Sequence, residues 1–211
     1  MAHGHTPSGE YTYVAEGDER TTSTLHWPAY ASGVTIGKGY DMRHRSSSEI
    51  YSDLIASGIS RKDAGLISKA SGLYGSEAEK FAKENKRNVS PLTKAQKVAL
   101  FDRIWPYYLS NTIRLYGTMV PKEVHESDIY PNAKQDSTWV TTDWYDLENK
   151  IQDVLVDIFY QGSWSKKIAK AGSKNDTEYL ARYLEVDPGQ NPYRSRRRPD
   201  YVRGIYSPKG F

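Results

Sequence analysis

The stretch EGDERTTSTLHWPAYASGVTIGKGYD, residues 16–41, decides how the N-terminal part of this chain is interpreted. It places a glutamate, Glu16, at one end and an aspartate, Asp41, at the other. Glycines recur in its second half, where they permit tight turns and a close approach of a ligand to the backbone. The strand-like content of residues 33–37 predicts a β-hairpin. A chain that folds back here would bring the two carboxyl groups toward one region.

Two acidic groups and a hydroxyl are what glycosidic bond cleavage requires. One carboxylic acid protonates the leaving oxygen, and a second acidic group activates water or attacks the sugar carbon. A glutamate in apolar surroundings is a good acid, because desolvation raises its pKa. The pattern therefore suggests Glu16 as the acid, Asp41 as the second group and Thr35 as the residue that holds water. Spacing alone leaves the alternative of surface or capping carboxylates open, since the chain has 26 acidic residues.

The composition limits the other kinds of chemistry. The 211 residues suit one domain. The absence of cysteine excludes a disulfide framework, a thiolate metal site and a cysteine nucleophile. Tyr is frequent, with 17 residues beside 5 Trp and 4 Phe. Aromatic side chains with a polar edge suit partly wet surfaces such as sugar sites, although they serve equally well in a core.

The net charge gives a mild bias toward anionic polymers. The net charge is +3, which favours approach to cell wall or nucleic acid without being a nucleic-acid footprint by itself. No apolar run approaches the roughly 20 residues that span a bilayer, so we expect no membrane association. The opening MAHGHTPSGEY has no basic-then-apolar signal segment.

Helix-start signals recur along the rest of the chain. These signals are Ser46 with Glu49, Ser60 with Asp63, Ser76 with Glu79, and Thr93 with Gln96. The helix that begins at Thr93 is expected to be the longest, and Pro106 is expected to kink or interrupt it. From about Thr142, a broad apolar stripe predicts a central buried helix that ends at Gly162. Residues 176–184 and 192–206 are two further helical candidates.

The strand signals are confined to the beginning of the chain. The segment YTYV at residues 11–14 has strand-like content, whereas residues 121–141 are polar and irregular and are expected to form a long connection. The predicted fold class is α+β, mostly α, in one domain over residues 1–211.

Within that domain we expect a flexible tail and two lobes. The tail would cover residues 1–10, a small β-containing active-site lobe about residues 11–45, and a larger helical lobe about residues 46–206.

The sequence also resembles a known family. AEG at residues 15–17, followed by SGVTIGKGYD at residues 32–41, resembles the active-site segment of phage-type lysozymes. The resemblance is greater to the pesticin-like muramidase branch, which includes bacteriocin, phage and type VI secretion cell-wall effectors. In that family a glutamate ends the first helix, and a β-hairpin with T-I-G-x-G follows. The T-I-G-x-G-Y-D block is the more specific part of the match.

Further segments are similar to the core and C-terminal helices of these enzymes, in the expected order. They are residues 92–101, 157–162 and 191–204. The resemblance covers about residues 13–206. It implies a lysozyme-like fold with a glycan cleft between the lobes, and an antibacterial or lytic peptidoglycan hydrolase that cleaves the β-1,4 bond between N-acetylmuramic acid and N-acetylglucosamine.

The resemblance assigns roles to individual residues. Glu16 would be the general acid and Thr35 would hold the nucleophilic water. In phage lysozymes the second carboxylate precedes the threonine, where this chain has HWPAY at residues 26–30 and no acid. The pesticin-like branch places an aspartate just after the motif, and Asp41 occupies that place. Whether cleavage retains or inverts configuration depends on the separation of the two carboxyl groups.

Neighbouring residues are candidates for substrate binding. Trp27, Tyr30 and Tyr40 could stack on sugar rings, and Gly37 would let a sugar approach the backbone. The alternative is that the aromatic residues pack the small lobe.

Two other acidic residues, Glu10 and Glu19, compete with Glu16 for the role of the general acid. If the first helix ran from Val14 through Glu19, then Glu16 and Glu19 would share a face and one could replace the other. The following glycine and the resemblance favour Glu16. Asp18 is most simply a solvated carboxylate.

No metal or other cofactor is predicted. His3 and His5 are interpreted as tail residues, and His26, His44 and His125 lack an H-x-x-x-H spacing. The basic run formed by Arg194, Arg196, Arg197, Arg198 and Arg203 allows a nucleic-acid site, a solvated helix face, a patch that meets an anionic wall polymer, or a structural helix packed by its tyrosines and arginine stems. We favour a solvated face on general grounds, and the resemblance favours the structural helix.

The expected partner is the glycan strand of peptidoglycan, and a cognate immunity protein would fit a toxin effector. We expect a monomer that binds no nucleic acid. It would act in the periplasm or cell wall of a target bacterium, delivered by a secretion apparatus or a phage holin. The alternatives are a glycosidase for chitosan or chitin and a non-catalytic wall-binding module, with a nucleic-acid binder as a more distant one.

Overall fold

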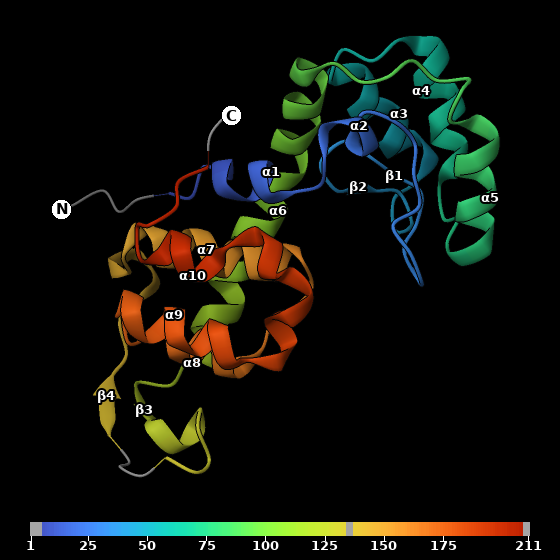
Figure 1. The fold of residues 1–211 in the computed structure, drawn as a ribbon. Helices are drawn as coiled ribbons and strands as arrows, with labels where there is room; N and C mark the ends of the chain where they lie inside the picture. The colour runs from blue at the N-terminus through green and yellow to red at the C-terminus, as the bar shows by residue number, and fades with distance from the viewer. Residues whose placement is uncertain (1–5, 134–136, 209–211) are drawn as a thin grey trace. The chain divides into compact units, whose positions relative to one another are not determined.

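Helices make up most of the protein in the computed structural model, which describes residues 6–133 and 137–208 (Figure 1). His3 and His5 lie outside the described residues. The fold class is α+β, mostly α, and the described residues contain two small antiparallel sheets of two strands each. The chain divides into two compact units, Glu16–Pro106 and a second unit formed by Met1–Ala15 together with Tyr107–Phe211.

The unit Glu16–Pro106 is built around a short hairpin. Its elements are α2 (Glu19–Thr22), β1 (Thr35–Ile36), β2 (Tyr40–Asp41), α3 (Ser47–Ala56), α4 (Arg61–Ile67), η1 (Ser68–Ala70), α5 (Gly75–Asn85) and the first part of α6 (Lys94–Met119). The apolar side chains of the hairpin region are buried with those of α3 and α6. These residues are Leu25, Val34, Ile36, Tyr40, Met42, Ile50, Leu54, Leu100 and Phe101. The hairpin is therefore the centre of this unit's core.

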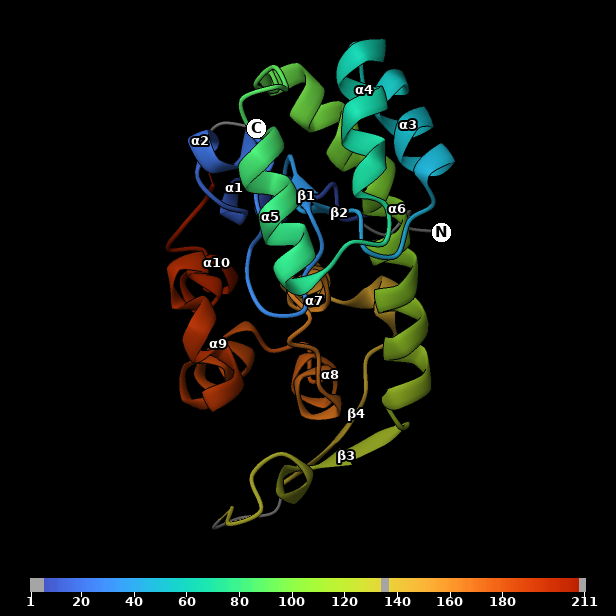
Figure 2. The same ribbon diagram turned by 90° about the vertical axis from the view of Figure 1, so that its right-hand side faces the viewer.

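The other unit is organised around helix α7. Its elements are α1 (Glu10–Ala15), the rest of α6, β3 (Glu123–His125), η2 (Glu126–Asp128), β4 (Thr138–Val140), η3 (Trp144–Asp146), α7 (Asn149–Tyr160), α8 (Lys166–Gly172), α9 (Thr177–Val186), η4 (Pro188–Arg196) and α10 (Arg198–Val202). Helices α1, α8, α9 and α10 pack against α7 (Figure 2). Helix α7 has the predicted apolar stripe, and Gly162 with φ 69° follows its end. It begins later than expected, because a short 3₁₀ turn occupies residues 144–146.

Most helix-start predictions are confirmed. The hydroxyl of Ser46 accepts the Glu49 N–H at 3.2 Å, and Ser60 caps α4 in the same way. Thr93 and Gln96 exchange two bonds of 3.0 and 3.2 Å, which is the reciprocal capping box.

The Ser76 start is wrong. Helix α5 already begins at Gly75, and its N-cap residue Tyr74 has no side-chain cap bond. The backbone of Tyr74 forms an isolated bridge with Gly33, so tertiary pairing sets this helix start. Helix α8 was not predicted, although Ser165 caps it conventionally by accepting the Ile168 N–H at 3.2 Å.

Pro106 does not interrupt α6, which runs continuously over 26 residues. Proline removes one backbone donor and crowds the preceding turn. The side chain of Pro106 is exposed, so water can satisfy the carbonyl that loses its partner. The boundary between the two compact units nevertheless falls here, between Pro106 and Tyr107.

Two secondary-structure predictions, for residues 11–14 and for residues 121–141, are wrong. Residues 11–14 belong to helix α1 rather than to a strand. The ring of Tyr11 stacks on Tyr201 at 4.1 Å and its hydroxyl donates to the Arg196 carbonyl at 2.6 Å, so packing overrides β propensity. The supposed connection 121–141 contains the antiparallel pair β3–β4. Only Val124 of that pair is buried, which explains the weak strand signal.

The predicted lobes do not coincide with the compact units. Within the first unit, the helices after residue 46 pack on the hairpin region, and the Leu92 N–H donates to the Ser23 carbonyl at 2.8 Å. The unit therefore extends to Pro106 instead of ending near residue 45. The described part of the expected tail is also ordered into the fold, since Pro7 is buried and Glu10 begins α1.

Candidate functional site

The β-hairpin predicted from the glycine-rich block is present. Strands β1 and β2 pair Thr35 with Asp41 and Ile36 with Tyr40. On its other side, Thr35 forms a bridge with His26, through two backbone hydrogen bonds of 2.8 and 3.0 Å. Thr35 is therefore the middle residue of three extended segments, and its side chain is buried. Its hydroxyl lies 3.4 Å from the Gly33 carbonyl.

Backbone donors fix the carboxylate of Asp41. The Gly33 N–H donates to Oδ2 at 3.1 Å, and the Arg43 N–H donates to Oδ1 at 2.8 Å. The Asp41 side chain is half-buried. This approach requires glycine at position 33, because a Cβ atom there would lie 2.3 Å from Asp41 Oδ1 and 2.7 Å from the Arg43 nitrogen.

We expect Gly33→Ala to displace this carboxylate and to lower the free energy of unfolding by about 1–3 kcal/mol, as overpacking does. The matched control is Gly65→Ala within α4, where a Cβ meets nothing within 4 Å. Alanine should raise helix stability there by about 0.5–1 kcal/mol. Urea denaturation of the two variants measures both effects. An unchanged midpoint for Gly33→Ala would contradict the close approach.

Glu16 directly follows α1, and Gly17 adopts a left-handed conformation with φ 56°. The Glu16 side chain is half-buried. The Nζ atom of Lys38, from the turn between β1 and β2, donates to the carbonyl oxygens of Glu16 at 2.8 Å and Gly17 at 3.2 Å. The backbone at Glu16 is thus tied to the hairpin that carries Thr35 and Asp41. These four residues, Glu16, Thr35, Lys38 and Asp41, are called the hairpin site below.

Glu19 does not share a helix with Glu16, which corrects the expectation of a common helix face. Helix α1 ends at Ala15 and α2 begins at Glu19. The Glu19 carboxylate forms ion pairs with Lys38, at 3.2 Å, and with Lys97. The hydrogen bond from Lys97, with a further contribution from Lys38, lowers the pKa of Glu19. Glu19 is therefore a counter-ion for two buried ammonium groups and a poor proton donor.

The remaining acidic residues of this segment also have identifiable places. Asp18 caps α2 by accepting the N–H groups of Arg20 at 3.0 Å and Thr21 at 2.9 Å, so it is more than a solvated carboxylate. Glu10 is an exposed residue in the first turn of α1.

The four candidate substrate-binding residues differ in accessibility. Tyr30 is 91% exposed, whereas Tyr40 is completely buried. The Tyr40 hydroxyl donates to Asp53 at 2.8 Å and Arg45 lies over its ring at 4.6 Å, so Tyr40 follows the packing alternative. The indole N–H of Trp27 donates to the Ser32 carbonyl at 3.1 Å. Gly37 lies in the hairpin turn with φ 65°.

Trp27 also lines a small pocket. The pocket has a volume of about 160 Å³ and is lined by Leu25, His26, Trp27, Glu79, Ala82, Lys83 and Lys86. An aromatic ring and polar groups on one concave surface are the kind of lining that a sugar contacts. Trp27 is therefore better placed than Tyr40 to meet a ligand.

Sequence reasoning missed the two buried lysines, Lys38 and Lys97, which are 3% and 2% exposed. A weak signal was present for Lys97, because it directly precedes the apolar stretch of residues 98–101 in α6. Its partner Glu19 is far away in the sequence and carries no signal of its own. Lys38 carried no such signal, because it lies between two glycines in the hairpin turn and not within an apolar segment.

The arginine run near the C-terminus is a structural feature of the other unit. Asp157 is fully buried and accepts hydrogen bonds from Arg196 Nε at 2.9 Å and Arg198 Nε at 2.8 Å. Both arginines are also buried, and Arg196 donates in addition to the Ala15 carbonyl at 3.1 Å. Burial raises the pKa of Asp157, but the two guanidinium groups outweigh it and lower that pKa overall.

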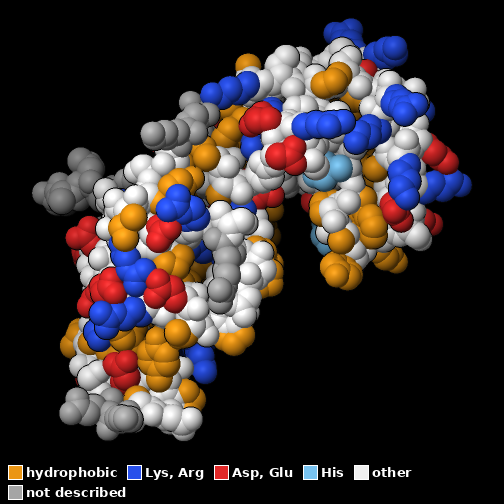
Figure 3. Space-filling view, in the orientation of Figure 1, with side chains coloured by type: hydrophobic (Ala, Val, Ile, Leu, Met, Phe, Trp, Pro, Cys, Tyr) orange, Lys and Arg blue, Asp and Glu red, His pale blue; other side chains and the backbone are white. Residues whose placement is uncertain are grey.

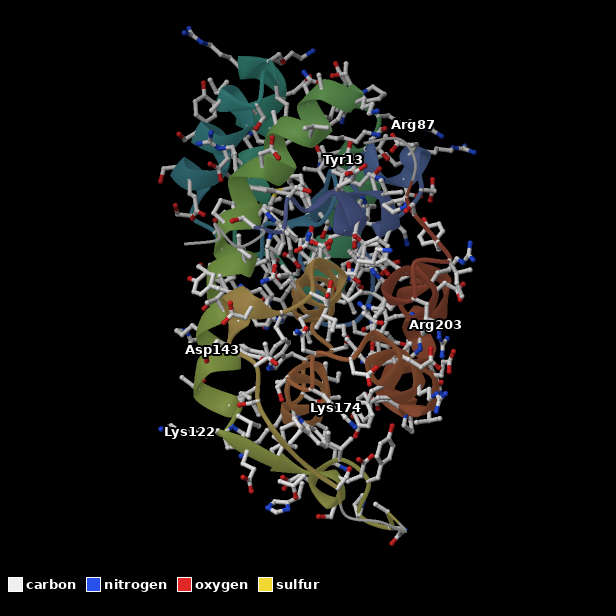
Figure 4. All side chains as sticks on the ribbon, turned by 90° about the vertical axis from the view of Figure 1, so that its left-hand side faces the viewer. Tyr13, Arg87, Lys122, Asp143, Lys174 and Arg203 are labelled. Carbon is white, nitrogen blue, oxygen red and sulfur yellow. The ribbon has the colours of Figure 1, made fainter. Side chains whose placement is uncertain are left out.

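Two more exposed arginines of the run, Arg197 and Arg203, are paired as well, and the side chain of Arg194 lies outside the part that the structure describes. Arg203, on the side of α9 and α10 in Figure 4, forms an ion pair with Glu178 at 2.7 Å and another with Glu185. Arg197 forms an ion pair with Asp200 at 2.8 Å. The structural alternative therefore holds for the buried Arg196 and Arg198, whereas Arg197 lies on a solvated surface with 49% of its side chain exposed.

A larger hollow lies elsewhere in this unit. Its volume is about 490 Å³, and its lining includes Tyr116, Lys122, Asp143, Trp144 and Tyr145. Lys122 and Asp143 are labelled in Figure 4. Among residues 6–133 and 137–208, no three His, Asp or Glu side chains are grouped so that they could hold a metal ion. In the same part of the chain, no helix is both long and apolar enough to cross a bilayer.

The model of a protein family, described as a domain of unknown function (DUF8812), matches residues 9–188. The chain belongs to this family. The DUF8812 match includes the whole hairpin site, Lys97 and Asp157, and it ends before Arg196 and Arg198. No match was found among curated proteins.

Proposed function

We propose that this DUF8812 protein is a lysozyme-like muramidase, which hydrolyses the β-1,4 bond between N-acetylmuramic acid and N-acetylglucosamine in peptidoglycan. One observation carries the proposal. Lys38 ties the backbone of Glu16 to a hairpin whose strands pair Thr35 with Asp41. A proton donor, a hydroxyl and a second carboxylate are thereby attached to one framework within one compact unit.

Each residue of the hairpin site has a role in the hydrolysis. Glu16 donates its proton to the glycosidic oxygen as the bond to the leaving sugar breaks. The hydroxyl of Thr35 orients the water that supplies the new C1 hydroxyl. Asp41, fixed by two backbone N–H groups, is the second carboxylate that acts on the water or the developing positive charge. The water's proton returns to the carboxylate pair, so the site is regenerated.

Features around the hairpin site also support the proposal. The block SGVTIGKGYD resembles the active-site segment of pesticin-like muramidases. Tyr30 and Trp27 offer aromatic surface for sugar rings. Helices α4 and α5 of the same unit carry exposed basic side chains, and Figure 3 shows Lys and Arg gathered over this part of the molecule. A basic surface favours approach to an anionic wall polymer.

Product analysis of digested wall tests this proposal. Purified peptidoglycan is incubated with the protein, and the released fragments are reduced with borohydride and analysed by mass spectrometry. We expect muropeptides whose reduced end is muramic acid, because cleavage on the muramic acid side leaves that sugar as the new reducing end. Reduced ends on glucosamine, release of free peptides, or binding to the wall without any release would each contradict the proposal. Incubation with chitosan and chitin oligomers serves as the substrate control.

A further inference from the structure

Lys38 has a charged side chain that is buried, which costs desolvation free energy. It projects from the turn between β1 and β2 and is only 3% exposed. Its Nζ atom lies 2.8 Å from the Glu16 carbonyl oxygen, 3.2 Å from the Gly17 carbonyl oxygen and 3.2 Å from a carboxylate oxygen of Glu19. An ammonium group has three N–H donors, and these three acceptors are all within hydrogen-bond distance.

Two of the three acceptors belong to residues that are in part accessible to water, because Glu16 is half-buried and Gly17 is exposed. Desolvating an ammonium group costs free energy unless partners compensate for it. A second bond, from the Gly37 N–H to the Thr22 carbonyl at 2.9 Å, ties the same turn to the end of α2. The hairpin turn is therefore hydrogen-bonded to the chain on both sides of Asp18, at residues 16–17 and at Thr22.

Lys97 provides an internal comparison. Its side chain is 2% exposed, which matches Lys38, and it also pairs with Glu19. Its other hydrogen bonds go to the Ser23 hydroxyl at 3.2 Å and the Glu19 carbonyl at 3.5 Å. Lys97 thus secures helix α2, whereas Lys38 reaches the backbone at Glu16 and Gly17.

We propose that Lys38 is a positioning residue for Glu16 in the hydrolysis. It holds the peptide groups on the C-terminal side of the Glu16 side chain at a fixed place relative to Thr35 and Asp41. It acts through this backbone and not through the sugar. A misplacement of about 1 Å at a reacting group reduces the rate on the order of 10²-fold. This inference rests on the muramidase function proposed above.

The test compares Lys38→Met with Lys97→Met on peptidoglycan fragments. Methionine keeps an unbranched stem and removes the charge. Both variants should lose thermal stability, because each removes a buried ammonium that pairs with Glu19. For Lys38→Met we expect kcat to fall on the order of 10²-fold with KM close to that of the wild type. For Lys97→Met we expect kcat to stay within a few-fold of wild type, because Lys97 bonds Ser23 and Glu19 and not the backbone at Glu16. Equal losses of kcat in the two variants would overturn the positioning role.

A rescue experiment covers the case in which Lys38→Met folds poorly. The chain has no cysteine, so Lys38→Cys can be alkylated at a single site in the unfolded state and then refolded. Bromoethylamine restores an ammonium group on a stem close to that of lysine, whereas iodoacetamide gives a neutral side chain. We expect only the ammonium form to recover kcat and the protection of amides 17–20 from hydrogen exchange. Equal recovery by the neutral form would refute the proposal.

The exchange measurement also separates this inference from the proposed function. If the wild-type protein releases no wall fragments, the muramidase proposal fails and the positioning role fails with it. Protection that still depends on the charge at position 38 would then show the tether to be structural alone. If the wild type is active and protection does not depend on that charge, only the role of Lys38 is refuted.

Discussion

Glu16→Gln is expected to abolish the release of muropeptides from peptidoglycan while the protein remains folded. Glutamine has nearly the same shape as glutamate but has no proton to give to the leaving oxygen. General acid catalysis contributes about 10²–10⁴-fold to such reactions, so the rate should fall at least about 10²-fold. The Glu16 side chain is half-buried, and the Lys38 bonds use the main-chain carbonyl groups, which the substitution leaves in place. Turbidity clearing and fragment mass analysis measure the loss.

The matched control is Glu10→Gln. Glu10 is an exposed residue of α1, and the same change there should leave clearing unaffected. Circular dichroism and thermal unfolding verify that both variants fold. Clearing by Glu16→Gln at the wild-type rate would remove Glu16 as the acid and with it the muramidase proposal in its present form.

Asp41 is a less suitable position for the same experiment. Both of its oxygens accept backbone N–H groups, from Gly33 and Arg43. Asparagine would bring an NH₂ group against one of these donors, because it retains one acceptor atom only. Loss of activity in Asp41→Asn would therefore combine a catalytic effect with a displaced hairpin. A substitution of the Glu16 side chain does not disturb the bonds from Lys38, because these go to the main-chain carbonyl groups of Glu16 and Gly17.

The sequence predicted local features of the fold well and non-local ones poorly. Caps such as Ser46 and the Thr93–Gln96 box involve residues three apart, so their geometry is contained in the local sequence. The hairpin was predicted for the same reason. The segment at residues 11–14 has strand propensity, yet its tyrosines pack on helices from the C-terminal part of the chain. Nothing within a window of a few residues records those contacts.

In the hairpin site, too, the local features were predicted from the sequence and the non-local contacts were not. Glu16, Thr35 and Asp41 were selected because residue type and a family motif point to them. The pairing of Thr35 with Asp41 then follows from a short hairpin. The tether from Lys38 to the Glu16 backbone joins residues 22 positions apart and could not be inferred from spacing. A lone charge within an apolar segment, as at Asp157, signals a buried partner without saying which residue it is.

Asp157→Asn is expected to lower the free energy of unfolding by about 3–5 kcal/mol, because removing one partner of a buried ion pair leaves uncompensated charge. Asp157 is fully buried and is the counter-ion for Arg196 and Arg198, which are themselves buried. Asparagine preserves the shape but not the charge, so two guanidinium groups remain desolvated. Urea denaturation measures the loss of unfolding free energy. Hydrogen exchange of the α7 amides in the native protein then shows whether that loss occurs in the unit that contains Asp157 and the two arginines.

The control for this prediction is Asp200→Asn. Asp200 also pairs with an arginine, Arg197, but that pair is solvent-exposed and should contribute only about 0–1 kcal/mol. Similar losses in both variants would contradict the burial argument.

The pH dependence gives a second and independent signature of the Asp157 network. The two arginines hold the pKa of Asp157 below its value in the unfolded chain, which is about 3.9. The unfolded state then binds the proton more tightly than the folded state, so this contribution to stability is complete above about pH 4 and decreases as the pH falls below it. The wild type should lose stability in that range more steeply than Asp157→Asn, which has no proton to bind at this position. Parallel pH profiles for the two proteins would mean that Asp157 is not the charged partner of Arg196 and Arg198, and the arginine run would need another counter-ion.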